Sequence, residues 1–569
     1  MTRRRRTLEL LSIVAVSLAA GLLQHPPGDN QTAHLALVKA LAHGTPRIDR
    51  YADETADDSF IDGHYYAAKA PGLALFTEPW YETLRLLHLD VKNPAAGKGA
   101  PAAFLEMPRS AIWQVGIFGA TLPALVLMLL VRWAAERVAR GYGGLVAVLG
   151  GAGTLLQPFA SLFFAHALAA TLAFGAFCIL ARERERDRSS PVLVGAAGLA
   201  SGLAIVVEFP TAIVALTLAA LVLVGTDRIK RGAAFAAGTV VGVLPLLAFD
   251  LWAFGSATTL SYTDAVITPG KTGHDVLGAN SRGFFGVEVP RPHAAVELLL
   301  ADKGMLVVSP IVVFAALGAV LAWRRPGRAE ALACAVICAL FLVYNAGYYL
   351  PFGGWGPGPR FLVAAIPFSL VLVAYALARY PLPVTAVGLC GVLAMALANG
   401  TAPIVSEQLG LGFWLGRLHV GDVEQTVLTR LGVTDRWAAV APYGLLLGLG
   451  VVLAFAAARP YANARAQLDL TATAVLGWLL VATSTPQLLA GEWWTGAFAA
   501  LTLLAAAGVT FALVDRVGFV GLLALAPAAV IALIPDFAEH SRWSLLAALA
   551  SVTLAAVTLA SRRGTPAPL

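Results

Sequence analysis

Apolar runs long enough to cross a bilayer recur from one end of this chain to the other, and no other feature constrains its fold as strongly. A helix needs about 20 apolar residues to cross the hydrocarbon. Hydrophobic residues make up 58% of the 569 residues and charged residues 13%, whereas ordinary soluble domains carry about 25% charged residues. The sequence therefore predicts an all-α, polytopic integral membrane protein and excludes a water-soluble globule.

Several of the apolar runs are short, so we expect about 13 to 16 transmembrane helices. The first run follows the basic residues Arg3 to Arg6 but lacks a small-residue cleavage site, which favours an uncleaved first span over a signal peptide. The candidate spans are residues 8–24, 111–131, 141–157, 162–181, 191–207, 209–225, 232–254, 304–323, 329–349, 360–378, 380–398, 438–458, 470–488, 494–513, 516–534 and 541–560.

The charges of the connecting segments predict the orientation of the spans, because cytoplasmic loops of membrane proteins carry an excess of Lys and Arg. With the N-terminus placed in the cytoplasm, every second connection contains Arg or Lys. The other connections are then extracytoplasmic. We expect a first transmembrane module at residues 1–398 with external loops 25–110 and 255–303, an extracytoplasmic loop at 399–437, and a C-terminal transmembrane module at 438–569.

The first external loop concentrates polar side chains in an otherwise apolar protein. Residues 29–72 contain six Asp, one Glu, three His and two Lys. Asp29 follows a Pro-Pro-Gly sequence that ends the first span. The next residues, 30–43, have helical spacing of apolar side chains, which predicts a short amphipathic helix at the membrane interface. Asp29 fits the N-cap of that helix, a functional carboxylate, or both.

An acidic cluster follows in the same loop, and two interpretations of it stay open. Its spacing does not match an EF-hand loop. The carboxylates could bind a divalent cation such as Mg²⁺ or Mn²⁺ through their oxygens, or they could form an ordinary solvated acidic loop. The cluster consists of Asp49, Asp53, Glu54, Asp57, Asp58 and Asp62.

Ionisable groups at membrane depth are predicted to gather at this same external face. Each costs about 2.5–3.5 kcal/mol at the bilayer centre on insertion scales, so each is a functional candidate. Lys69, Lys303 and Arg360 are candidates for binding a phosphate, and Arg360 suits a headgroup anchor equally well. Candidates for contact with a substrate, of which the aromatic ones also suit the membrane interface, are His64, Tyr65, Tyr66, His166, Glu208 and Trp355.

The arrangement of a first span, Asp29, an external amphipathic helix and then Lys69-Ala70-Pro71 resembles the polyprenyl-phosphate-sugar-dependent glycosyltransferases of the GT-C fold. It looks most like the bacterial branch related to protein O-mannosyltransferases and lipid A aminoarabinose transferase. There an Asp-Glu pair begins the first external loop and a Lys-Pro-Pro motif closes it. This chain has Asn30 in place of the Glu and Ala70 in place of a Pro.

The resemblance implies a GT-C-like fold and a membrane glycosyltransferase activity. Asp29 would be the catalytic general base, with a second carboxylate from Asp49 or Asp58, and Lys69 would bind the donor phosphate. The implied donor is a polyprenyl-phosphate hexose or pentose, such as mannose or arabinofuranose. The implied acceptor is a cell-envelope glycan, lipid or protein on the extracytoplasmic face of a bacterial plasma membrane.

Two other classes of function stay open at this point. A flippase or transporter for lipid-linked sugars would show internal repeats and polar groups near the midplane, and a polysaccharide polymerase or ligase would rely on Arg and His in large external loops. No P-loop, Rossmann fingerprint, HExxH or GxSxG motif is present. The net charge of +6 is accounted for by the cytoplasmic loops, which makes a nucleic-acid partner improbable and leaves membrane lipids as the expected surroundings.

Overall fold

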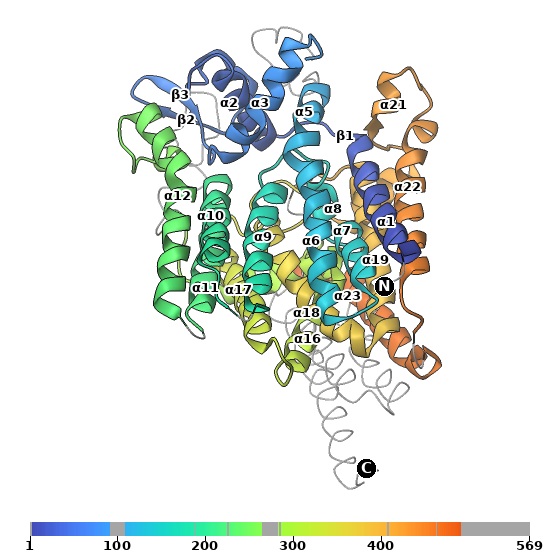
Figure 1. Cartoon of the computed structure of the whole chain (residues 1–569). Coiled ribbons are helices and arrows are strands. Elements are labelled where there is room, and N and C mark those ends of the chain that lie inside the picture. The colour runs from blue at the N-terminus through green and yellow to red at the C-terminus, as the bar shows by residue number, and fades with distance from the viewer. Residues whose placement is uncertain are drawn as a thin grey trace.

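Long helices arranged side by side form most of the molecule (Figure 1). The structure is a computed structural model. It describes residues 3–90 and 109–490, except for residues 187, 225–226, 265–282, 284–285, 407–408 and 462–463. The predicted spans 494–513, 516–534 and 541–560 lie outside the described residues.

The prediction of an all-α polytopic membrane protein is confirmed. In the part of the chain that the structure describes, seven helical segments are long and apolar enough to cross a membrane. They are Ser110–Val138, which joins α5 (Arg109–Gly116), η2 (Ile117–Thr121) and α6 (Leu122–Val138), then α9 (His166–Arg184), α12 (Arg228–Phe254), α17 (Arg328–Gly347), η6 (Arg360–Ala365) with α18 (Ile366–Arg379), α19 (Pro381–Thr401) and α22 (Arg436–Ala457).

Several of the remaining predicted spans are short or broken. The predicted span 304–323 is broken at Pro310, where two apolar segments, Pro292–Val308 and Pro310–Ala322, meet at 110°. A proline has no backbone N–H to continue a helix. These segments contain α14 (Pro292–Leu300), α15 (Met305–Val308), η5 (Pro310–Val313) and α16 (Phe314–Ala322). The others are α1 (Arg3–Leu22), α7 (Gly143–Ala152), α8 (Leu156–Phe159), α10 (Pro191–Val207), η3 (Phe209–Thr211), α11 (Ala212–Val222), η7 (Ala464–Gln467) and α23 (Leu468–Ala490).

Helices α10 and α12 pack closely because glycines face each other along the crossing. A Cβ atom added at Gly198 would collide with the carbonyl oxygen of Phe235, and one added at Gly238 would collide with that of Gly195. Small residues of this kind let two helix backbones approach within a membrane bundle.

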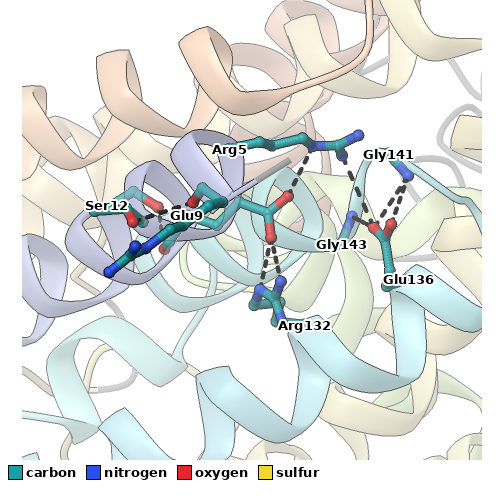
Figure 2. A network of polar contacts seen from close by, with 9 residues as sticks. Arg5, Glu9, Ser12, Arg132, Glu136, Gly141 and Gly143 are labelled. Carbon is teal, nitrogen blue, oxygen red and sulfur yellow. Dashed lines mark hydrogen bonds and ion pairs between the residues drawn. The ribbon is translucent and has the colours of Figure 1, made fainter. Parts of the chain in front are cut away.

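A buried carboxylate attaches the first turns of α1 to the bundle (Figure 2). Glu9 is 1% exposed and accepts hydrogen bonds from Arg5 Nε at 3.2 Å and from Arg132 Nε at 2.6 Å. Glu136 in turn accepts from the backbone N–H groups of Gly141 and Gly143. Pairing of this kind is what allows a charge to be buried. At its other end α1 continues into β1 (Leu23–Gln24), which pairs antiparallel with β4 (Gln425–Thr426).

The loop segments gather at the end of the bundle to which α1 leads (Figure 1). Here lie α2 (Asp29–Leu41), η1 (Asp49–Glu54), β2 (Asp58–Ile61), β3 (His64–Ala67), α3 (Gly72–Leu86), η4 (Ser261–Asp264), α20 (Leu411–His419) and α21 (Val427–Arg430). The turn of the β2–β3 hairpin has Asp62 and Gly63 at positive φ, 50° and 86°, as a two-residue hairpin turn requires. We call this the loop end. We call the opposite end, where α9 ends at Arg184 and α17 begins at Arg328, the arginine end.

The predicted helix after Asp29 is present as α2, but it is buried on all sides instead of lying half in lipid. Residues 31–40 of α2 are all buried. Its N-cap is Gly28, and the Asp29 carboxylate accepts from the backbone N–H of Ala56 at 3.3 Å. The interpretation of Asp29 as an N-cap is therefore wrong, because its side chain is held by the chain that folds over α2.

Candidate functional site

A cavity of about 460 Å³ lies at the loop end of the bundle. It forms where α2, the turn after β3, the start of α9, the turn between α10 and α11, the end of α17 and the start of η6 converge. Most of its lining is apolar. The polar and aromatic residues in it are Asn30, His34, Lys69, His166, Glu208, Phe209, Tyr262, Tyr344, Tyr348, Arg360 and Phe361.

Several residues that line this cavity carry a buried polar atom without a hydrogen-bond partner. Among the described residues, fifteen buried side-chain atoms lack a partner, and five of them belong to cavity-lining residues. Most buried polar groups in proteins are paired, so each exception requires an explanation. A polar ligand in the cavity would supply the missing partners. The five atoms are Asn30 Oδ1, His34 Nδ1, His166 Nε2, Glu208 Oε2 and Arg360 Nε.

His166 and Glu208 form a buried pair on one wall. His166 is the first residue of α9, and Glu208 is the C-cap of α10, where Pro210 lies two residues farther on. The distance from His166 Nδ1 to Glu208 Oε1 is 2.7 Å. A carboxylate is only an acceptor, so Nδ1 donates this hydrogen bond, and Nε2 is an acceptor in the neutral tautomer that carries its proton on Nδ1.

Two cations line the same cavity. Lys69 is 5% exposed, forms an ion pair with Asp57 and lies 5.4 Å from the centre of the Tyr262 ring. Arg360 lies over the rings of Phe164 and Phe361, at 5.4 and 5.5 Å. The His166 ring contacts the same two phenylalanines, so the imidazole and the guanidinium share two aromatic neighbours.

Asp29 lies next to the cavity, one residue before Asn30. Besides its bond to Ala56, its backbone carbonyl accepts from Thr55 Oγ1 at 3.0 Å. Burial, and then the negative charge of Asp57, raise the pKa of Asp29 above its ordinary value. Burial, helped by the Lys69 charge, lowers the pKa of His34 to about 3. Burial lowers the pKa of Lys69, and the Asp57 charge partly offsets this effect.

The β2–β3 hairpin accounts for several predicted residues without bringing them to the cavity. The Asp49 carboxylate binds His64 Nδ1 at 2.9 Å and the backbone N–H of Tyr65 at 2.6 Å. Tyr66 donates its hydroxyl to the carbonyl of Ala253. These bonds hold the hairpin on η1 and α12. None of the four residues lines the cavity.

Three further predicted residues also lie away from the cavity lining. Lys303 is fully buried, and its Nζ donates to the carbonyls of Gly356 and Val405 at 3.0 and 3.1 Å. It therefore joins the Gly/Pro-rich turn before η6 to the chain after α19. Trp355 is 66% exposed, and its carbonyl accepts from Arg360. Asp58 is buried on β2, where its charge also raises the pKa of Asp29.

The sequence did not single out several residues that line the cavity. Asn30 and His34 lie one helical turn apart on α2, which is a spacing that places two side chains on one face. Tyr344 and Tyr348 have the same spacing at the end of α17. That repeated spacing of polar residues beside apolar runs is the signal that could have identified them.

The acidic cluster in the sequence left the possibility of a divalent-cation site undecided. The structure shows no group of three or more His, Cys, Asp or Glu side chains placed to hold a metal ion, within the part of the chain that it describes. Asp57 is engaged by Lys69, and Asp49 by the hairpin.

No family model and no curated protein matches this chain. It is similar to the solved structure of ArnT from Cupriavidus metallidurans bound to undecaprenyl phosphate, with 14% identity and a TM-score of 0.43 over 96% of this chain and 77% of that one. It is also similar to the oligosaccharyltransferase AglB from Archaeoglobus fulgidus in complex with an inhibitory peptide and a dolichol-phosphate, with 14% identity and a TM-score of 0.44 over 84% and 60%. Both are GT-C proteins, the group that the sequence resembles. At 14% identity the likeness assigns no residue role and no substrate to this chain.

Proposed function

We propose that this protein is a membrane glycosyltransferase that transfers a sugar from a polyprenyl-phosphate donor to a hydroxyl group of a cell-envelope glycan, lipid or protein. One observation carries the proposal: five polar residues that line a mostly apolar cavity each have a buried side-chain atom without a hydrogen-bond partner, and a buried lysine lines the same cavity. Such a cavity suits a ligand with a charged, hydroxyl-rich head and an apolar chain.

The donor phosphate is assigned to Lys69 and Arg360. Arg360 has an N–H group without a partner, and a guanidinium binds phosphate oxygens with a fixed geometry. Lys69 is held by Asp57 and Tyr262, so its ammonium is oriented before the donor arrives. Both cations would stabilise the negative charge that the phosphate gains when the sugar leaves.

The sugar is assigned to the wall formed by Asn30, His166 and Glu208. Their partnerless atoms, Oδ1, Nε2 and Oε2, are acceptors when the imidazole is neutral. Sugar hydroxyls are the donors that match them. The apolar lining, including Val207, Ile213 and Leu260, would contact the first isoprene units of the lipid.

Asp29 is the proposed general base. In the reaction the bond between the anomeric carbon and the phosphate oxygen breaks, and a bond forms between that carbon and the acceptor oxygen. The acceptor hydroxyl gives its proton to the Asp29 carboxylate, and polyprenyl phosphate leaves with the bonding electron pair. The raised pKa of Asp29 makes it a stronger base than an ordinary aspartate at neutral pH. We place the reaction on the extracytoplasmic face, to which the loop end corresponds.

The proposal is tested with purified full-length protein in lipid and radiolabelled polyprenyl-phosphate arabinofuranose, mannose, glucose and galactose, with cell-envelope extract as acceptor. Wild-type protein should release polyprenyl phosphate from one donor, and Asp29→Asn should lower the rate by a factor on the order of 10² or more. Asp53→Asn is the matched control, because Asp53 is an exposed acid of the same loop. Equal release by wild type and Asp29→Asn would remove Asp29 from the mechanism. No release from any donor, with no donor binding, would contradict the function itself.

A further inference from the structure

A second pocket, lined by arginines, lies at the arginine end of the bundle. It has a volume of about 490 Å³ and is formed by the end of α9, the residues before α10, the corner between α11 and α12, and the start of α17. Four arginines and two glutamates line it: Arg184, Arg186, Arg231, Arg328, Glu183 and Glu330. The lining thus carries two more positive than negative charges.

The two glutamates are already paired, and this leaves the excess positive charge in the pocket. Glu183 binds Arg231 Nη2 at 2.8 Å, and Glu330 binds Arg184 Nε at 2.8 Å. Arg186 and Arg328 make no ion pair with any residue that the structure describes, and both are exposed. Arg231 is 5% exposed, and its Nε has no hydrogen-bond partner. The pocket therefore offers N–H donors to an anion.

Apolar surface borders the pocket. Val224 lines it and is 50% exposed, Leu223 is 53% exposed, and Ile229 on the first turn of α12 is 81% exposed. From there the exposed face of α12 continues along the bundle through Val240 and Leu244. An anion with an attached acyl chain could place its phosphate among the arginines and its chain along α12. A chain-free phosphate would use the arginines alone.

We infer that this pocket is a binding site for a phosphate group, carried by an anionic phospholipid of the leaflet at the arginine end. Guanidinium groups are well suited to phosphate oxygens, and basic pockets between transmembrane helices bind phospholipid headgroups. The site lies at the other end of two helices that line the cavity: α9 carries His166 at one end and Arg184 at the other, and α17 begins at Arg328 and carries Tyr344 near its other end. The inference does not depend on the proposed glycosyl transfer.

The test uses full-length protein in nanodiscs and needs no enzymatic assay. Thermal unfolding and lipid retention by native mass spectrometry are measured in phosphatidylcholine alone, in phosphatidylcholine with phosphatidylglycerol, and in phosphatidylcholine with added inorganic phosphate. Three proteins are compared: wild type, Arg186→Gln with Arg328→Gln, and the control Arg324→Gln with Arg325→Gln. The control removes the same charge from two exposed arginines at the same end that do not line the pocket.

Wild type and control should be stabilised by phosphatidylglycerol and should retain it, whereas the pocket variant should bind it roughly tenfold more weakly or worse, since two charge-assisted contacts are lost. A different result would be that inorganic phosphate stabilises wild type as much as phosphatidylglycerol does, with the effect lost in the pocket variant. That result would confirm the phosphate site but would identify its ligand as free phosphate, which overturns the assignment to a lipid. If the pocket and control variants lose phosphatidylglycerol binding equally, the binding depends on general surface charge, and the inference is overturned. Absence of any stabilisation in wild type would overturn it as well.

Discussion

Glu208 Oε1 lies 2.7 Å from Nδ1 of His166, and the two side chains are otherwise enclosed by the wall of the cavity. Nδ1 and Oε1 are each other's hydrogen-bond partners. The other end, His166 Nε2 and Glu208 Oε2, has no partner. The arrangement orients the imidazole for a ligand in the same way that a carboxylate orients a catalytic histidine.

The first prediction concerns this pair. His166→Gln and Glu208→Gln should each weaken donor binding or turnover by roughly 10- to 100-fold, because a charge-assisted hydrogen bond is worth about 1.5–3 kcal/mol. The double variant should be no worse than the more damaging single variant, since the residues act as a unit. His64→Gln, which changes an exposed imidazole of the hairpin, is the control. Additive losses would show that the two residues act independently.

The second prediction concerns the pH at which activity is lost. If Asp29 is the base, the rate falls as pH drops through its raised pKa, because the carboxylate becomes protonated. The charge of Asp57 contributes to that raised pKa, so Asp57→Asn should move the acid limb of the pH–rate profile to lower pH. The control is Asp49→Asn, which changes a carboxylate bound to the hairpin and should leave the acid limb of the profile in place. An acid limb that Asp57→Asn does not move would point to a different base.

The third prediction separates binding from stability at Lys69. Lys69→Met removes the cation of the buried Lys69–Asp57 ion pair, and breaking a buried pair from one side typically costs 3–5 kcal/mol. Combining Lys69→Met with Asp57→Asn should restore most of the thermal stability, because the buried negative charge is removed as well. Donor binding should stay weak in the combined variant if Lys69 contacts the phosphate. Recovery of binding together with stability would assign Lys69 a structural role alone.

The fourth prediction concerns stability below neutral pH. His34 has its pKa lowered to about 3 in the folded protein, whereas an unfolded histidine titrates near 6.5. Between these values the unfolded chain binds more protons, so His34 makes the free energy of unfolding rise with pH. From pH 7 to pH 5 the loss should be about 2 kcal/mol. Thermal unfolding at pH 5 and 7 should show a smaller pH difference for His34→Gln than for wild type, while His419→Gln, an exposed histidine, should keep the wild-type difference.

Local patterns in the sequence were sufficient for the class of fold and for part of the site. An apolar run and the proline that ends it can be recognised in a segment of about 20 residues. The helix α2, the turn at Glu208 and the polar character of the first loop follow from such local patterns. The choice of Lys69, His166, Glu208 and Arg360 as candidates rested on the cost of placing ionisable groups at membrane depth. All four line one cavity.

The tertiary structure decided which of the remaining candidates share that cavity. Asp49, Lys303 and Trp355 were candidates from the same external segments, and Lys303 is a lysine like Lys69. Their side chains are nevertheless directed into the hairpin, to backbone carbonyls and to the surface, respectively. Asn30 and His34 carry no signal by themselves. They line the cavity because the chain from η1 to β3 covers one side of α2, while the cavity lies between α2, α9 and Arg360.

The sequence by itself thus determined that this is a membrane-embedded helical protein with polar side chains concentrated in the loop after its first helix. The partners of each charge were decided by the fold. The physical reason is that burial of a charge is set by contacts between segments far apart in the chain, such as Lys69 with Tyr262 and His166 with Glu208, while hydrophobic periodicity acts only along neighbouring residues.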